Sequence, residues 1–75
     1  ADFNYQVYPN PTSTQLNVLL NGEFEYHLTD VRGRLILKGS ATDEVQLDLE
    51  NYERGMYLLH IFHDSHYQNE KVILK

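Results

Sequence analysis

The chain has 75 residues, no cysteine and a formal net charge of −5, with 41% hydrophobic and 12% aromatic residues. This length fits one small domain over residues 1–75, and the apolar content is too high for a disordered segment. The acidic balance disfavours nucleic-acid binding, because carboxylates repel phosphates, and no apolar run reaches the ~20 residues of a membrane helix. We therefore expect neither nucleic-acid binding nor direct membrane insertion.

The start of the chain has no basic segment followed by an apolar stretch, which is the mark of a signal peptide. The chain is then either cytoplasmic or a piece of a longer protein, and we favour the piece. Residues 1–4 are interpreted as the end of an upstream linker.

Short apolar runs of period two, each followed by a turn signal, predict an all-β fold. The runs at residues 16–20 and 24–28 place their even-numbered apolar side chains on one face. Asn21-Gly22 between them predicts a hairpin turn, since both residues tolerate positive φ. A second turn is expected around Val31-Arg32-Gly33.

The middle of the chain continues this pattern. A short buried strand is expected at residues 35–37 and is ended by Gly39-Ser40, and another strand is expected at 45–49. Residues 50–55 are expected to form a loop before the most apolar run, residues 56–62. Helical spacing of apolar residues is not sustained anywhere, so no helix is predicted.

The last turn is expected at residues 64–68, and residues 72–74 close the fold. Together these elements predict an immunoglobulin-like antiparallel β-sandwich of about seven strands. A last strand that is short and amphipathic is a candidate edge, open to pairing with another chain. We therefore expect a homodimer through this edge.

Three histidines invite a metal-binding interpretation, because neutral imidazole is a common metal ligand. His60, His63 and His66 are spaced three apart. In a strand, however, His60 and His63 point to opposite faces, and His66 falls in the turn that follows. We favour exposed strand and turn histidines over a metal site.

The carboxylates and serines lack the spacing of known catalytic or calcium sites. Asp43, Glu44 and Asp48 do not form an Asp-x-Asp-x-Asp-Gly loop. No serine lies in a Gly-x-Ser-x-Gly elbow, and Ser65 cannot form a catalytic relay with its immediate chain neighbours. We expect no enzyme activity, no metal and no cofactor.

The six tyrosines have two interpretations: an aromatic platform for sugars or partner chains, or packing in the core and at its rim. We favour packing, because tyrosine is a good strand residue and no tryptophan supports a platform. The residues concerned are Tyr5, Tyr8, Tyr26, Tyr52, Tyr57 and Tyr67.

Four short motifs follow one another along the chain. They are Tyr8-Pro9-Asn10-Pro11, the stretch 28–34 with Asp30, Gly33 and Arg34, the stretch 54–59 with Gly55 and Tyr57, and the stretch 70–75. In this order and spacing they resemble the type A C-terminal sorting domain of the type IX secretion system of Bacteroidota, the Por secretion system sorting family. The resemblance covers residues 5–75. The chain departs from the family pattern at Tyr52, where leucine is usual.

The first two motifs also have a physical interpretation that is independent of the family. Pro9 and Pro11 restrict the backbone around Asn10, so the chain enters the fold at a fixed angle. Asp30 can cap its own turn by accepting backbone N–H bonds, and Gly33 supplies the positive φ that closes this turn.

The last two motifs have a similar interpretation. Gly55 is expected to supply a positive φ before the central apolar strand. On the last strand, Lys71 and Lys75 have the parity opposite to Val72 and Leu74, so the lysines are expected to face solvent.

The resemblance implies a C-terminal signal that directs a folded cargo protein from the periplasm through the outer membrane, to the cell surface or the medium. The implied partners are the type IX secretion machinery and a sortase-like cysteine peptidase, which usually removes the domain and joins the cargo to an anionic lipopolysaccharide. The alternative is a retained immunoglobulin-like binding or interaction module of a cell-surface protein or of the secretion machinery. The candidate recognition residues, with 71–75 as the main element, are Tyr8, Pro9, Asn10, Pro11, Asp30, Gly33, Arg34, Gly55, Tyr57, Lys71, Val72, Ile73, Leu74 and Lys75.

Overall fold

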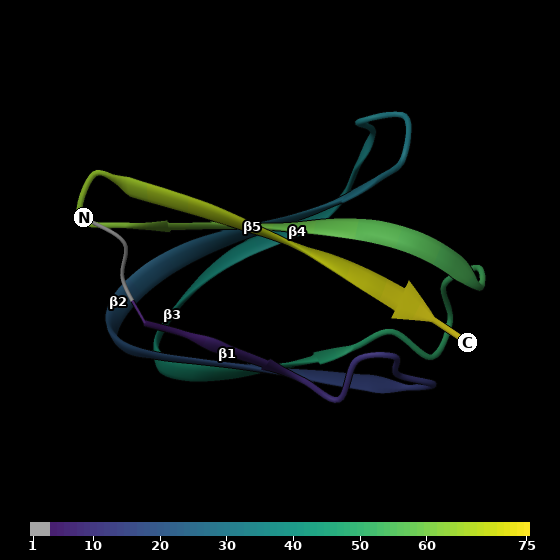
Figure 1. Cartoon of the computed structure of the whole chain (residues 1–75), viewed down its shortest axis with the longest axis horizontal. Coiled ribbons are helices and arrows are strands. Elements are labelled where there is room, and N and C mark those ends of the chain that lie inside the picture. The colour runs from purple at the N-terminus through teal and green to yellow at the C-terminus, as the bar shows by residue number, and fades with distance from the viewer. Residues whose placement is uncertain (1–3) are drawn as a thin grey trace.

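The computed structural model describes residues 4–75, which form five β-strands and no helix. The strands are β1 (Gln6–Tyr8), β2 (Gln15–Asp30), β3 (Leu35–Asp48), β4 (Gly55–His63) and β5 (His66–Leu74) (Figure 1). The all-β prediction is confirmed, and the described residues contain no helix long and apolar enough to cross a membrane. The predicted linker at residues 1–4 lies outside the described part, except for the exposed Asn4.

The long strand β2 organises the sheet, because all three of its neighbours pair with it in antiparallel fashion. β3 pairs along most of its length, β1 pairs with its first half, and β4 pairs with its second half. β5 then pairs with β4, which gives the strand order β1-β2-β4-β5 with β3 attached to β2. Segments from both ends of the chain therefore belong to one sheet.

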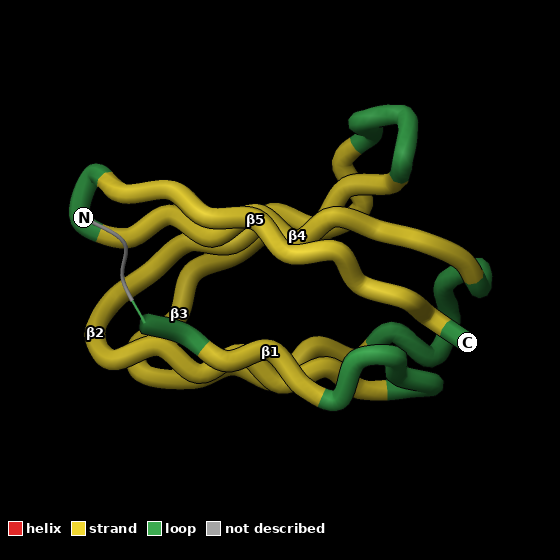
Figure 2. Tube along the Cα trace, viewed as in Figure 1, coloured by secondary structure: helices red, strands yellow, loops and turns green. Residues whose placement is uncertain are grey.

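This sheet curls until its two halves face each other (Figure 2). The first half, here called the β1 layer, contains β1, residues 15–20 of β2 and residues 43–48 of β3. The second half, the β5 layer, contains the remaining parts of β2 and β3 together with β4 and β5. The long hairpin of β2 and β3 thus belongs to both layers.

The predicted hairpin at Asn21-Gly22 is wrong, because the chain bends there without reversing. Gly22 has a φ of 110°, and the pairing with β3 shifts by a bulge between Leu20 and Glu23. Its N–H donates to Asp43 Oδ1 at 3.0 Å. A bulge with positive φ bends a strand but leaves its ladder running on, so the two predicted strands are one.

The predicted break at Gly39-Ser40 is also wrong. Both residues lie inside β3, and Gly39 pairs with Tyr26 of β2. A Cβ atom at Gly39 would come within 2.8 Å of the Tyr26 ring, so this glycine leaves room for an aromatic neighbour. Residues 4–75 therefore form five strands rather than about seven, and the immunoglobulin-like sandwich is not confirmed.

The core lies between the two layers and contains the apolar side chains that the alternation predicted. At the β5 layer, odd-numbered residues of β4 and even-numbered residues of β5 point inward, as expected for a strand. The buried apolar residues are Leu16, Val18, Leu20, Phe24, Leu28, Leu47, Leu49, Tyr57, Leu59, Ile61, Val72 and Leu74. Tyr5, Tyr26 and Tyr52 pack against this cluster and Tyr57 belongs to it, so four of the six tyrosines support the packing interpretation over the platform.

Of the two other predicted turns, the one around Gly33 is confirmed and the last one is shorter than predicted. The turn around Gly33 is confirmed, with a φ of 86° and a Gly33 N–H bond to the Asp30 carbonyl. The last turn is shorter than predicted, because Asp64 and Ser65 both adopt positive φ and form the turn by themselves. His66 therefore opens β5 and does not lie in the turn.

The prediction that the last strand is an open edge is wrong at one end of that strand. The outer edge of β5 is not open at its C-terminal end, because the segment after β1 forms a parallel bridge there between Thr12 and Leu74. β3 pairs only with β2 among the described strands, so it leaves an edge unpaired. The homodimer itself remains a prediction.

Candidate recognition site

Asn10 binds the last strand from the side. Its Nδ2 donates to the Lys71 carbonyl at 2.7 Å, and its Oδ1 accepts from the Ile73 N–H at 3.1 Å. One carboxamide thus presents a donor and an acceptor to the edge of β5, as a neighbouring strand would. The peptide bonds that precede Pro9 and Pro11 are both cis in this loop.

Thr12 continues this contact with its own backbone. Its N–H donates to the Ile73 carbonyl at 2.9 Å, and its carbonyl accepts from the Lys75 N–H at 2.8 Å. The side chain of Thr12 is buried, and its hydroxyl donates to the Gln15 carbonyl. Residues 10–12 therefore act as a short additional strand that covers the end of β5.

The register of the sheet joins this contact to the other two motifs. Asp30 of β2 lies opposite Tyr57 of β4, and Tyr57 lies opposite Val72 of β5. Gly55 lies opposite Leu74 in the same way. All four sequence motifs thus form one continuous belt, here called the motif belt: residues 10–12, 71–75, 55–57 and 30–34.

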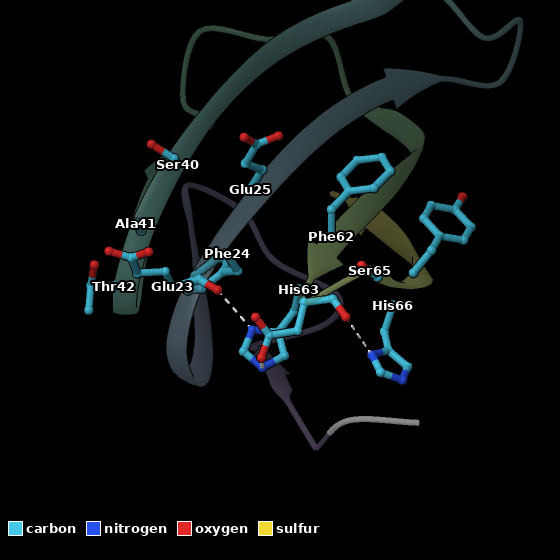
Figure 3. Close-up of a pocket in the computed structure, with 12 residues that line it drawn as sticks. Glu23, Phe24, Glu25, Ser40, Ala41, Thr42, Phe62, His63, Ser65 and His66 are labelled. Carbon is cyan, nitrogen blue, oxygen red and sulfur yellow. Dashed lines mark hydrogen bonds and ion pairs between the residues drawn. The ribbon is translucent and has the colours of Figure 1, made fainter. Parts of the chain in front are cut away.

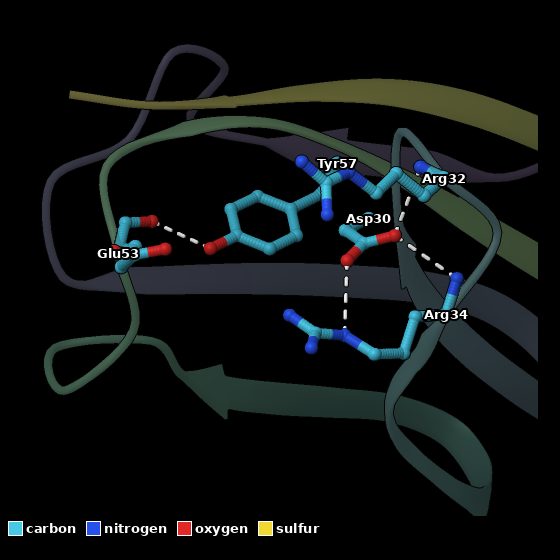
Figure 4. A network of polar contacts seen from close by, with 5 residues as sticks. All are labelled: Asp30, Arg32, Arg34, Glu53 and Tyr57. Atoms are coloured by element: carbon cyan, nitrogen blue, oxygen red, sulfur yellow. Dashed lines mark hydrogen bonds and ion pairs between the residues drawn. The ribbon is translucent and has the colours of Figure 1, made fainter.

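Asp30 organises the turn at one end of this belt (Figure 4). Its Oδ1 accepts the backbone N–H groups of Arg32 and Arg34, each at 2.9 Å, and its Oδ2 accepts Arg34 Nε at 3.1 Å. The backbone N–H of Arg34, then that of Arg32 and the Arg34 guanidinium, hold the pKa of the Asp30 carboxyl below its usual 3.8. The carboxylate is therefore charged at neutral pH and keeps this turn closed.

The loop before β4 is fixed by two side chains that bind backbone carbonyls. The Tyr57 hydroxyl donates to the Glu53 carbonyl at 2.5 Å, as Figure 4 shows. Arg54 Nη1 donates to the Ser13 carbonyl, which ties this loop to the loop after β1. Both loops lie at the end of the molecule where the chain terminates (Figure 1), here called the motif end.

The exposed parts of the belt are mainly basic. Val72 and Leu74 are buried, whereas Lys71 and Lys75 are exposed, which confirms their predicted parity. Among residues 4–75, neither lysine takes part in an ion pair. Arg34 keeps a side-chain exposure of 75% although it binds Asp30.

The predicted site residues fall into four groups. Asn10, with the backbone of 71–75, forms the contact at the edge of β5, and Asp30, Gly33 and Arg34 form the turn. Gly55, with a φ of 148°, and Tyr57 connect the two. The exposed Tyr8, Pro9 and Pro11 shape the loop that carries Asn10, and the Tyr8 carbonyl accepts a bond from Asn17 Nδ2.

Two residues of the site, Thr12 and Arg54, were not predicted from the sequence. Thr12 acts through its backbone, and residue type carries no signal of a backbone bond to a distant strand. Arg54 is separated by 41 residues from the carbonyl that it binds. Its position beside Gly55 was the only available signal.

At the opposite end of the molecule, here called the bend end, a hollow of about 720 Å³ opens (Figure 3). Its lining includes the carboxylates of Glu23, Glu25 and Asp64 and the imidazoles of His63 and His66. The His63 Nδ1 binds the Glu23 carbonyl at 2.8 Å, and the His66 Nδ1 binds the Asp64 carbonyl at 2.9 Å. No group of three or more potential ligands in the described chain is arranged to hold a metal ion.

The described residues form a small curled β-sheet in which Asn10 and Thr12 clamp the last strand, with exposed lysines beside this contact. Residues 6–75 match the family described as the secretion system C-terminal sorting domain. The chain belongs to this family, the C-terminal sorting domains of type IX secretion, and the resemblance seen in the sequence is confirmed. A search of curated proteins finds no match to the chain.

Family membership gives the general role of the domain. It is a C-terminal sorting signal of type IX secretion, which interacts with that machinery. The protein that carries it is exported to the outer membrane or the extracellular space.

Proposed function

We propose that the motif belt is the surface by which the secretion machinery recognises a folded cargo in the periplasm and directs it through the outer membrane. The observation that supports this is the binding of the last strand by Asn10 and Thr12. Motifs that are separated by about sixty residues in sequence become one surface only after folding. The signal is therefore a folded shape and not a linear tail.

Within the terminal motif, the burial pattern separates recognition from folding. Val72 and Leu74 are buried in the core and are not available to a partner. Lys71, Ile73 and Lys75 point outward, and the two lysines are exposed. In this proposal the lysines contact the machinery, and the buried residues keep them in place.

We further propose that the domain catalyses no reaction and takes no cofactor. A sortase-like cysteine peptidase cleaves the chain upstream of the domain and joins the cargo to an anionic lipopolysaccharide. This proposal follows the usual fate of cargo in the family. Mass spectrometry of the exported product tests it, because a cleaved cargo lacks residues 6–75.

Export of a reporter tests the recognition proposal. A fluorescent protein with an inner-membrane signal peptide is fused in front of residues 1–75 and expressed in a host with type IX secretion. The wild-type fusion is expected at the surface or in the medium, and in the periplasm of a host without the translocon. Retention in the periplasm of the competent host, with the domain folded, contradicts the proposal.

The lysines are tested in the same assay with a control that is matched in charge. Lys71→Gln with Lys75→Gln lowers the net charge by two, as does Gln6→Glu with Asn21→Asp at exposed positions outside the belt. Only the lysine pair is expected to block export. Equal export of both doubly substituted domains contradicts a direct role for the lysines.

A second candidate function is a retained interaction module, and it rests on exposed aromatic residues. Tyr67 is 48% exposed and packs against Phe62 with ring centroids 5.2 Å apart. Exposed aromatic rings of this kind bind sugars and partner chains. Binding of the isolated domain to a glycan array, lost in Tyr67→Ala, supports this candidate. An exported protein that still contains residues 6–75 also supports it, because a retained module is not cleaved.

A further inference from the structure

The outer surface of the β5 layer is a continuous face whose side chains align in rows across four strands. One row runs Leu35, Thr29, Leu58 and Lys71, from β3 to β5. Residues in register on neighbouring strands point to the same side of a sheet. The other rows of this face, here called the β5 face, are Lys38, His27, His60 and Asn69; Ser40, Glu25, Phe62 and Tyr67; and Met56 with Ile73.

Large apolar side chains remain accessible on the β5 face. Leu35 is 48% exposed, Met56 is 45% exposed, and Leu58 and Ile73 lie half-buried beside them. Aromatic contacts extend this surface, since the His27 ring lies 5.0 Å from the Phe62 ring and His60 stacks on Tyr67. Contiguous apolar surface on a small protein marks an interaction site.

The outer surface of the β1 layer, here called the β1 face, is polar by contrast. Gln46 Nε2 donates to Gln15 Oε1 and to Asn17 Oδ1, which forms a ladder of amides across β2 and β3. Asn17 Nδ2 in turn donates to the Tyr8 carbonyl. Leu19 is half-buried on this face, opposite Gln6 and Glu44 in the register. Because β2 and β3 contribute to both faces, the difference arises from which of their residues point outward in each layer.

Charge separates the two faces in the same way. The named rows of the β5 face contain two lysines, Lys38 and Lys71, and one carboxylate, Glu25, and the pair of Glu23 and Thr42 adds a second carboxylate at the bend end. The rows of the β1 face contain Glu44 and Asp48 and no lysine or arginine. In a chain of net charge −5, the two lysines of this face and the adjoining exposed Lys75 favour an acidic partner surface at the C-terminal part of β5.

We propose that the β5 face docks onto a protein surface of the secretion machinery that has an apolar centre and carboxylates around it. This rests on the proposed function, and the face is continuous with the motif belt, because Lys71 and Ile73 belong to both. A bilayer of anionic lipid is disfavoured as the partner, since the net charge of −5 repels it. The β5 face thus supplies contact area beside the terminal lysines.

Leu58 and Leu19 provide a matched pair for the test. Both are half-buried leucines on interior strands, one on each face of the sheet. Leu58→Thr is expected to slow export of the reporter about fivefold or more, whereas Leu19→Thr is not. Met56→Gln, at an exposed position at the start of β4, is expected to slow export without loss of folding, which circular dichroism checks. Equal export rates for these three variants and the wild type overturn the proposal.

Lys38 tests the acidic character of the partner. Lys38→Gln and Gln46→Glu both lower the net charge by one, on the β5 and β1 faces respectively. Slower export of Lys38→Gln alone supports the proposal, and slower export of Gln46→Glu alone overturns its charge argument. If the wild-type reporter is exported and the face variants behave like it, only this inference fails. If the wild-type reporter is not exported, the proposed function fails.

Two measurements distinguish the other occupants of this face. Flotation with vesicles of phosphatidylethanolamine and lipopolysaccharide tests a membrane partner, and sedimentation of the purified domain tests a second copy. We expect the fraction of domain that floats with vesicles and its sedimentation coefficient to be the same for wild type and Leu58→Thr. Vesicle binding or dimerisation that Leu58→Thr abolishes overturns the assignment to a partner protein.

Discussion

At the motif end, side chains bind distant backbone groups, whereas at the bend end the backbone itself changes direction. Asn10 and Arg54 reach carbonyl groups 61 and 41 residues away in sequence. The bend end instead gathers four residues of positive φ, namely Gly22, Asp43, Asp64 and Ser65. Long-range bonds occur at both ends, since His63 binds the Glu23 carbonyl 40 residues away, but the described non-glycine residues of positive φ all lie at the bend end.

Charge follows the same division. Lys38 lies on the β5 face, and the other lysines and arginines of the chain lie in the motif belt or directly before one of its segments: Arg32, Arg34, Arg54, Lys71 and Lys75. The bend end carries Glu23, Asp43, Glu44 and Asp64, whereas the motif end carries carboxylates, among them Asp30, Glu50 and Glu53, as well as most of the basic residues. The comparison indicates that the end holding the chain terminus is the one arranged for contact with another molecule.

The largest expected effect comes from the core beneath the terminal motif. Leu74 is 2% exposed, and Leu74→Ala should lower the free energy of unfolding by about 2–5 kcal/mol. A domain of this size has little stability in reserve, so part of the population will unfold at 37 °C. Urea denaturation measures the change.

Leu19→Ala is the control for this prediction, because Leu19 is half-buried on the outer surface. It should cost about 1 kcal/mol or less. Equal losses for the two variants would show that the last strand is not part of the cooperative core. The prediction also means that deletion of residues 72–75 removes the fold together with the signal, so it cannot test recognition.

The second prediction compares the glycines of the two ends. Gly22 and Gly33 both have positive φ, but a Cβ atom at Gly22 would lie 3.2 Å from His63 Cε1, whereas one at Gly33 meets no atom within 4 Å. Gly33→Ala should therefore cost about 1 kcal/mol from backbone strain alone, and Gly22→Ala about 2 kcal/mol. Thermal unfolding measures both values. A larger loss for Gly33→Ala would contradict the view that the bend end depends more on its backbone.

Much of the fold could be predicted from the sequence, because alternation is a local signal. The parity of Tyr57, Leu59 and Ile61, and that of Val72 and Leu74, followed from period-two spacing alone. The strand count could not be predicted in this way. A glycine with positive φ produces either a hairpin or a bulge, and the choice at Gly22 depends on Asp43, which lies 21 residues away.

The candidate site shows the same limit. Sequence order and spacing identified Asn10, Asp30, Gly55 and Lys71 through the family resemblance, and the local turn at Asp30 followed from its chemistry. The contact between Asn10 and the last strand could not be predicted, because a carboxamide that binds a strand edge leaves no periodic pattern in the sequence. Only the folded chain brings its amide group to residues 71–73.

The third prediction concerns this clamp. Asn10→Ala removes two hydrogen bonds to β5, at an exposed site where water can replace them, and should cost about 1–2 kcal/mol. Asn17→Ala is the matched control, since it also removes two hydrogen bonds of a carboxamide, of 3.3 and 3.2 Å, but neither involves β5. It should cost about 1 kcal/mol and leave the protection of Ile73 unchanged. Hydrogen exchange of the Ile73 amide is the sharper measurement, because Asn10 accepts its bond directly. Unchanged protection of Ile73 in Asn10→Ala would contradict the clamp.

The smallest expected effect is a pH dependence at Asp30. The pKa of Asp30 is lowered in the folded state, so its contribution to stability is present above the usual value of 3.8 and is lost as pH falls through the lower folded pKa. Wild type should therefore be more stable than Asp30→Asn at pH 7, and the difference should shrink below about pH 4. Arg34→Gln keeps the backbone N–H that is the main cause of the shift, so it should retain most of this pH dependence. Urea denaturation between pH 3 and 7 compares the three proteins. Loss of the pH dependence in Arg34→Gln would show that the guanidinium, and not the turn backbone, holds the carboxylate in its charged form.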